Sequence, residues 1–299
     1  MKNGVLDENK IAFVDSGVGG LIFGIDTIIE MSLNYDISKL SFVHIGDTAN
    51  MPYGIKTTQE LSTTLTNLIH KAISYNAKTI VIACNTACTI MDDKFLKQFD
   101  TYNVNIVTII KGTARYIYNK TPTLNNTKHI GILGTMQTIK SQEYERALIT
   151  EHNNQKSNVN LKIETYSPVT WEEDIENNIP KDKIYNEVSQ QMTKFKNKIG
   201  DENFNNIQTL GLCCTHYPYF YNEILTFFKN NSKQLDIKII SQGMIFAKIL
   251  GDSLNLLKLN NLKQKIKISS YLTGNDCLKT QHIINNMYQN IELSVDKYK

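Results

Sequence analysis

Short apolar segments alternate with amphipathic helical segments along most of the chain. The apolar runs are rich in β-branched residues and have the length of strands that are buried on both faces. Such an alternation predicts parallel sheets covered by helices, the doubly wound α/β architecture. Nine strands are expected, at residues 11–15, 40–46, 78–84, 104–109, 128–134, 160–166, 207–213, 236–241 and 266–272.

Three of the intervening segments carry apolar residues at the helical period. In 57–76 an apolar residue recurs at every third or fourth position, and Thr57 with Glu60 forms a candidate capping box at its start. Two further helices are predicted in 184–199 and 220–228.

An internal similarity indicates how these elements are divided. The segment Thr79–Thr86 resembles Thr209–His216, because each is an apolar strand that ends in a cysteine followed by small polar residues. The length of 299 residues suits two domains at roughly 150 residues each. We therefore expect two α/β domains of related plan that face one shared interdomain cleft. The first would comprise 1–112 plus 236–299, and the second 113–235. The alternative is that buried strands look alike by chance.

Composition narrows the class of protein. The residues AVILMFWYC make up 41%, charged residues 20%, and the net charge is +3, as in ordinary globular proteins. No run has the roughly 18 apolar residues of a membrane span, and Met1–Lys10 lacks the apolar core of a secretory signal. Only Arg115 and Arg146 are arginines, too few for a protein that reads nucleic acid. A cytoplasmic location is expected, with no membrane or nucleic-acid partner.

The five cysteines are the first candidates for chemistry. They are odd in number and form no CxxC pair, which disfavours a disulfide framework and a zinc site. No metal ligation is therefore expected. Free cysteines are usually buried and inert, so local context must identify a reactive one. The five are Cys84, Cys88, Cys213, Cys214 and Cys277.

Two of the cysteines stand where ligands gather in parallel sheets, at the ends of strands. Cys84 ends one predicted strand and Cys214 follows another, with His216 two residues further on. A thiol with a reference pKa of ~8.5 acts as an acid or a base near neutrality once it is tuned. Two thiols suit the inversion of a stereocentre, whereas a Cys–His hydrolase needs only one. We expect Cys88, Cys213 and Cys277 to be packing residues.

Two loops could serve either a ligand or the fold alone. Asp15 opens the glycine-rich turn 15–20, which follows a strand and precedes a helix. Its amides suit an anion, and Asp15 is a candidate acid, base or orienting group, although both features also occur in plain turns. The loop Pro52–Gly54 could likewise bring backbone amides and a tyrosine to a ligand, or it could be a plain turn.

Five motifs together resemble bacterial glutamate racemase. They occur in the order and spacing of that family from about Ile11 to Gly274. The resemblance implies a cofactor-independent racemase that interconverts L- and D-glutamate for peptidoglycan synthesis, and a homodimer. The motifs are Asp15–Gly20, Gly46–Thr48 with Pro52–Gly54, Ala83–Ala87, Gly134–Ser141 and Cys214–Pro218.

The resemblance also implies roles for individual residues. Cys84 and Cys214 match the two acid/base thiols, and Asp15 and His216 match the residues that assist them. A further set falls on positions that hold the substrate: Ser16, Pro52, Tyr53, Gly54, Asn85, Thr86, Thr135, Thr138 and Thr215.

The chain departs from the family pattern in three places. Cys88 replaces a usual serine or threonine. Cys213 stands where the family usually has glycine. The segment 167–178 begins with Ser-Pro-Val in place of Cys-Pro-Leu and then loses register, so an acidic family residue there is not assigned. The divergence leaves open a racemase of aspartate or another α-amino acid on the same scaffold. A ligand-binding relative without catalysis is the further alternative.

Overall fold

The structure is a computed structural model that describes residues 9–156, 158–232, 236–258, 266–274, 277–288 and 291–297. Most of the segment Met1–Lys10, on which the expectation about a secretory signal rests, lies outside the described residues. The chain divides into two compact units. Unit 1 comprises 1–109 with 243–299, and unit 2 comprises 110–242.

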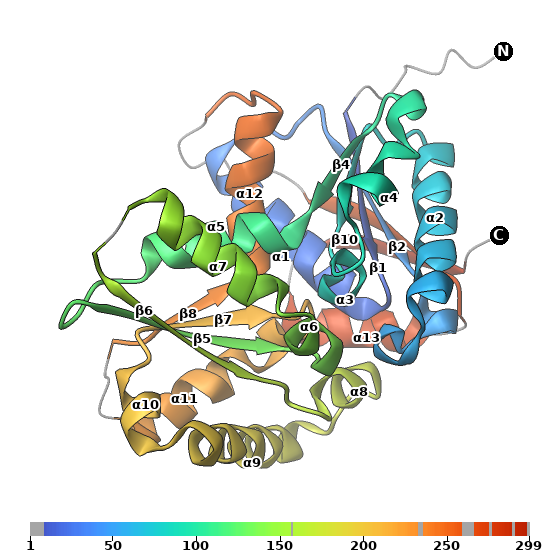
Figure 1. Ribbon diagram of the computed structural model, residues 1–299. Coiled ribbons are helices and arrows are strands. Elements are labelled where there is room, and N and C mark those ends of the chain that lie inside the picture. Colours follow the sequence, from blue (N-terminus) through green and yellow to red (C-terminus); the bar gives the residue numbers. More distant parts are fainter. Residues whose placement is uncertain are drawn as a thin grey trace, which may run out of the picture. The chain divides into compact units, whose positions relative to one another are not determined.

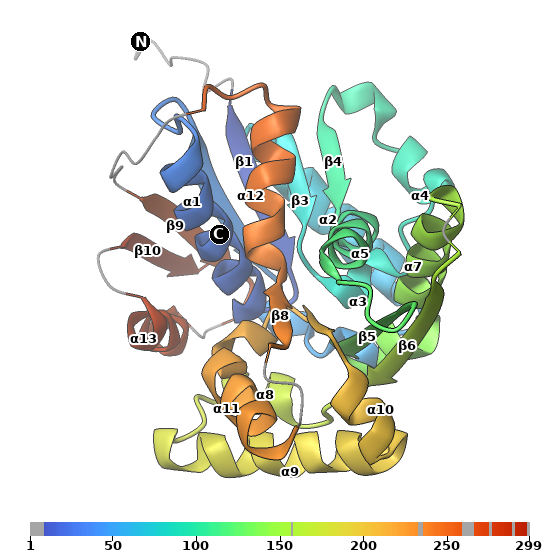
Figure 2. The same cartoon turned by 90° about the vertical axis from the view of Figure 1, so that its left-hand side faces the viewer.

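Unit 1 is built on a sheet of six parallel strands in the order β10-β9-β2-β1-β3-β4. Helices α1 and α12 cover one face of this sheet and α2 covers the other (Figures 1 and 2). The strands are β1 (Lys10–Asp15), β2 (Ser41–Gly46), β3 (Thr79–Ile82), β4 (Asn105–Thr108), β9 (Lys267–Leu272) and β10 (Glu292–Lys297). The helices are α1 (Val18–Asn34), α2 (Thr58–Ser74), α3 (Asn85–Cys88), α4 (Asp93–Lys97), α12 (Gln242–Ser253) and α13 (Cys277–Met287).

Unit 2 repeats this plan with a smaller sheet of parallel strands in the order β6-β5-β7-β8. Helices α5 and α7 lie on one face, and α9 and α11 on the other (Figure 1). The strands are β5 (Thr127–Gly134), β6 (Asn160–Tyr166), β7 (Thr209–Cys213) and β8 (Lys238–Ser241). The helices are α5 (Ile109–Lys120), α6 (Met136–Ser141), α7 (Glu143–Asn154), α8 (Trp171–Glu176), α9 (Lys181–Ile199), α10 (Asp201–Asn206) and α11 (Tyr221–Asn231).

The predicted α/β class is confirmed, and each of the nine predicted strands corresponds to an observed strand. The bounds of β6 agree with the prediction, and the other strands differ from it slightly at one or both ends. The capping box is also present, since Thr57 Oγ1 accepts from Glu60 N at 3.3 Å and Glu60 Oε2 accepts from Thr57 N at 2.8 Å. The predicted strand 78–84 is shorter than expected, because β3 ends at Ile82 and Cys84 lies just beyond it. Strand β10 was not predicted.

Aromatic side chains fill the core beneath each sheet. In unit 1 the ring of Phe23 lies 5.9 Å from that of Phe13 and 5.4 Å from that of Phe246. In unit 2 Phe204 stacks on Phe228 with ring centroids 4.5 Å apart. None of the described helices is both long and apolar enough to cross a membrane.

Candidate active site

In unit 1, two adjacent strands bring the first candidate thiol beside the glycine-rich turn. β1 and β3 pair in parallel, and the amide of Ala83 donates to the carbonyl of Val14 at 2.9 Å. The residues that follow the two strands therefore leave the sheet side by side. Cys84 Sγ lies 3.8 Å from Ser16 Oγ, in hydrogen-bond contact, and Cys84 is 6% exposed. Sequence reasoning placed these residues at strand ends, and the register brings them into contact.

The carboxyl group of Asp15 is held between the end of β1 and the first turn of α1. Asp15 is buried, and a Cβ added at Gly20 would lie 2.2 Å from the Cβ of Asp15. Only glycine at this position lets the helix approach so closely. The Gly20 position therefore fixes where the Asp15 side chain can lie.

A third loop in unit 1, residues 52–54, carries the phenol side chain of Tyr53. The Tyr53 hydroxyl donates to Asp47 Oδ2 at 2.8 Å, and Asp47 Oδ1 accepts from Thr273 at 2.8 Å. Burial, then the charges of Asp47 and Cys84, raise the pKa of Tyr53, so it remains a neutral hydrogen-bond donor. Its predicted companions Pro52 and Gly54 are exposed, unlike Tyr53 itself. Asp47 was predicted only as part of a motif, with no role of its own.

Unit 2 repeats the arrangement of adjacent strand ends. β5 and β7 pair in parallel with Gly134 opposite Cys213, so Thr135 and Cys214 leave neighbouring strands. Thr135 caps α6 by accepting from the amide of Thr138 at 3.3 Å, and the two hydroxyls lie 2.9 Å apart. These predicted binding residues thus form a fixed pair beside the second thiol.

Cys214 belongs to a buried chain of three ionisable groups. Its Sγ lies 3.7 Å from His216 Nδ1, and His216 Nε2 lies 2.7 Å from Glu176 Oε1. Burial raises the pKa of the Cys214 thiol, and His216 partly offsets this. Burial alone would lower the pKa of His216, but its hydrogen bonds to Cys214 and Glu176 outweigh that effect and raise it. His216 is therefore set to hold a proton next to the thiol.

Glu176 is the functional candidate that sequence reasoning missed. It ends α8, which lies in the segment whose register with the family pattern was lost. The helix is anchored by Trp171, which is fully buried with its ring 5.1 Å from the rings of both Tyr217 and Phe220. Tyr217 directly follows the Cys214–His216 segment, and Phe220 lies three residues further on. Packing of Trp171 thus sets the carboxylate of Glu176 against His216.

On the opposite side of β7, Cys213 contacts a different group. Cys213 is fully buried and hydrogen-bonds Tyr144, and burial raises the pKa of its thiol. Gln242 Nε2 donates to Tyr144 Oη at 2.8 Å and to Thr113 Oγ1 at 3.1 Å. Gln242 and Thr113 stand near the two points where the chain passes between the units. The predicted packing role of Cys213 is confirmed by this buried network.

The remaining predicted binding residues lie next to one or the other of the two candidate thiols. Asn85 and Thr86 are buried at the start of α3, directly after Cys84, and Thr215 is buried between Cys214 and His216. Cys88 packs with its thiol 3.3 Å from the Ile82 carbonyl, whereas Cys277 is partly exposed and so less buried than predicted.

Each unit thus offers a buried thiol beside groups that donate hydrogen bonds or move protons. Within the described residues, no three His, Cys, Asp or Glu side chains are arranged to hold a metal ion. The arrangement suits acid–base chemistry on a small polar molecule.

Comparisons with known proteins point to one family. No protein-family model matches the chain. A glutamate racemase of Bacillus cereus is 31% identical over 209 residues, which cover 70% of this chain and 68% of that protein. Among solved structures, glutamate racemase isoform RacE1 of Bacillus anthracis superposes with a TM-score of 0.72 at 26% identity, covering 97% of this chain and 98% of that one. A glutamate racemase of Francisella tularensis solved with D-glutamate has a TM-score of 0.69 at 21% identity, with 98% of each chain covered.

Proposed function

This chain belongs to the glutamate racemase family, and we propose that it interconverts L- and D-glutamate by a two-base mechanism. The observation that carries the proposal is that each unit places a buried thiol with polar partners just beyond the end of a parallel strand: Cys84 beside Ser16, and Cys214 beside His216. The mechanism requires that the two units present these thiols to one shared cleft, which we include in the proposal.

The reaction transfers one proton to the substrate for each proton removed. One cysteine acts as a thiolate and takes the α-proton, leaving the electron pair of the broken C–H bond on a carbanion conjugated with the α-carboxylate. The other cysteine, as a thiol, gives its proton to the opposite face of the α-carbon and becomes the thiolate. Atoms and charge balance without a redox change or a second substrate, and no cofactor is needed.

The neighbouring groups tune these two thiols. His216, whose pKa is raised by Cys214 and Glu176 against the effect of burial, stabilises a thiolate at Cys214 and shares its proton. Asp15 takes the corresponding position in unit 1, where the close approach of Gly20 confines it. A buried, polar setting of this kind strengthens each electrostatic interaction at the reacting carbon.

The substrate is proposed to be held by neutral hydrogen-bond donors and acceptors. The hydroxyls and amides of Ser16, Tyr53, Asn85, Thr86, Thr135, Thr138 and Thr215 suit two carboxylates and an ammonium group. Pro52 and Gly54 complete the loop that carries Tyr53. We further propose that D-glutamate made here supplies peptidoglycan in the cytoplasm, and that the enzyme acts as a homodimer.

The test is a solvent-exchange assay with L-glutamate or D-glutamate in deuterated water, without added pyridoxal phosphate or metal. The wild-type protein is expected to incorporate deuterium at the α-carbon and to racemise both enantiomers. Cys84→Ala and Cys214→Ala are each expected to abolish racemisation, since each removes one of the two groups that exchange protons. Each variant should retain exchange for only the enantiomer that faces its remaining thiol.

Cys277→Ser is the matched control, because Cys277 is partly exposed and lies outside the motifs that carry the two thiols. It should keep full activity. Racemisation that survives in both single-thiol variants would overturn the two-base mechanism. Faster turnover of L-aspartate than of L-glutamate would redirect the proposal to the alternative substrate.

A further inference from the structure

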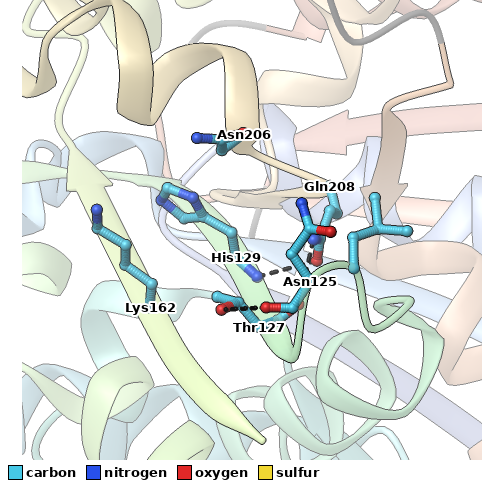
Figure 3. A pocket seen from close by; sticks show the side chains of 7 residues that line it. Asn125, Thr127, His129, Lys162, Asn206 and Gln208 are labelled. Atoms are coloured by element: carbon cyan, nitrogen blue, oxygen red, sulfur yellow. Dashed lines mark hydrogen bonds between the residues drawn. The ribbon is translucent and has the colours of Figure 1, made fainter.

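A polar cavity lies at the amino-terminal end of the unit 2 sheet. Its volume is about 320 Å³, and its walls come from the amino ends of β5, β6 and β7 with the turn before β5 (Figure 3). His129 in this cavity is six residues from Thr135 along β5, or about 20 Å at roughly 3.3 Å per residue. Ligands of parallel sheets bind at the carboxyl ends of strands, so this cavity is not explained by the reaction.

On one wall of the cavity, both polar atoms of the Gln208 side chain form hydrogen bonds with the backbone. Gln208 Oε1 accepts from the backbone amide of His129 at 3.0 Å, and Gln208 Nε2 donates to the carbonyl of Thr127 at 3.2 Å. Both ends of this amide are therefore committed to the fold. The cavity is held open by the amino-terminal end of the sheet and does not need a ligand to form.

Four further residues with polar side chains line the cavity. Figure 3 shows Lys162, Asn206, Asn125 and the His129 ring around it. Lys162 is the cation of the set, and it stands directly opposite His129 in the parallel pairing of β5 with β6. Its Nζ also donates to Asn203 Oδ1, outside the cavity lining, and keeps further N–H donors for a ligand. The two asparagine amides add N–H donors.

His129 is the buried group that points to a ligand. The residue is 2% exposed, and among the described residues its Nε2 has no hydrogen-bond partner. Glu164 Oε1 lies 3.6 Å from this Nε2, too far for a hydrogen bond. A buried polar atom without a hydrogen bond is costly, and a ligand that reaches it would remove that cost.

We propose that this cavity binds a small oxyanion, a phosphate or carboxylate group, through Lys162, the amides of Asn125 and Asn206, and the His129 imidazole. The cavity lies at the lower end of the size range of ligand sites, roughly 300–1,000 Å³, so it has room for the oxyanion and a small attached group. Lys162 supplies the charge and the neutral donors supply orientation.

The binding is coupled to a proton. Burial, then the charge of Lys162, lowers the pKa of His129 to about 4, so the imidazole is neutral when the cavity is empty. Glu164 Oε1 already lies 3.6 Å from Nε2, and a bound oxyanion adds further negative charge beside the same imidazole. Both then favour the imidazolium, and the anion binds more tightly as the pH falls.

The test follows the His129 imidazole by NMR at constant ionic strength, in the full chain, while inorganic phosphate or acetate is added. Saturable shifts with a raised His129 pKa are expected for at least one probe, and the comparison of probes identifies phosphate or carboxylate as the preferred group. Lys162→Gln should weaken binding about 10-fold or more, as expected for the loss of one charged hydrogen bond. Lys194→Gln removes an exposed lysine of α9 and should leave binding unchanged.

Equal weakening in both lysine variants, or no saturable change at His129 with either probe, would overturn the proposal. Lys162 is exposed and outside the strand-end groups, so Lys162→Gln should fold and keep wild-type turnover of glutamate. The result is therefore independent of the racemase assay.

Discussion

At the scale of single residues, the carboxylate of Glu176 has the clearest consequence. It accepts from His216 at 2.7 Å inside a site where His216 is 1% exposed. A buried charge pair of this kind depends on both partners, and removing one leaves the other in an apolar setting. The pair also explains how a histidine that burial would discharge keeps its proton.

We predict that Glu176→Gln lowers kcat for glutamate about 10-fold or more, within the range that general acid–base groups contribute. Glutamine keeps an acceptor near His216 Nε2 but removes the negative charge that raises the pKa of His216. The imidazole then loses its proton at a lower pH, so the alkaline limb of the kcat–pH profile should move down in pH. Steady-state rates measured across the pH range check this.

Glu173→Gln is the matched control, since Glu173 is on the same helix and exposed. It should leave both the rate and the profile unchanged. A slower Glu176→Gln enzyme with an unshifted alkaline limb would mean that Glu176 positions a loop and does not set the protonation of His216.

At the scale of elements, the contact between α1 and β1 determines the geometry of Asp15. We predict that Gly20→Ala lowers kcat at least about 10-fold, because the new methyl group would lie 2.2 Å from the Cβ of Asp15 and one of the two must move. Gly24→Ala, on the same helix, would meet the ring of Phe13 at 2.9 Å, away from the strand end. It should lower the melting temperature but keep kcat. Equal loss of activity in both variants would contradict a specific role of the Asp15 contact.

The network behind β7 also belongs to this scale. We predict that Gln242→Leu lowers the free energy of unfolding by about 1–3 kcal/mol, because it leaves the buried hydroxyls of Thr113 and Tyr144 without their shared donor. Thr113→Val breaks one of the two hydrogen bonds and removes the hydroxyl itself, so its effect should be smaller. Urea unfolding followed by circular dichroism measures both, and an unfolding energy unchanged by Gln242→Leu would show that the network adds no stability.

Comparison of sequence and structure at this scale shows which elements can be predicted from the local sequence alone. Strands such as β1 and β7 are predictable because they are buried on both faces and read as apolar runs. β10 was missed because it is an edge strand whose residues are mostly exposed, so its sequence carries no apolar run. Glu176 was missed for another reason. It lies 40 residues from His216, and only the packing of Trp171 brings the two together.

At the scale of the whole molecule, two units of one plan carry matching chemistry. In each, a central strand pair of the parallel sheet ends in a thiol and a hydroxyl-bearing turn: β1 with β3, and β5 with β7. The sequence similarity of Thr79–Thr86 and Thr209–His216 predicted this correspondence. The shared cleft remains a prediction that the single-thiol variants test.

Acid sensitivity of the whole fold is the last consequence, and it rests on His44 in the centre of the unit 1 sheet. His44 is fully buried with Nδ1 2.9 Å from Ser270 Oγ, and burial lowers its pKa to about 3. Unfolding restores an ordinary histidine, which takes up a proton below about pH 6.5. Between about pH 6.5 and 3 the unfolded chain therefore binds one more proton, and the free energy of unfolding should fall by about 1.4 kcal/mol for each unit that the pH falls. His44→Gln, which keeps a partner for Ser270 but does not titrate, should show a shallower decline in urea unfolding followed by circular dichroism. His70→Gln, which changes an exposed histidine of α2, should follow the wild type. Parallel curves for wild type and His44→Gln would show that His44 does not govern the acid limit.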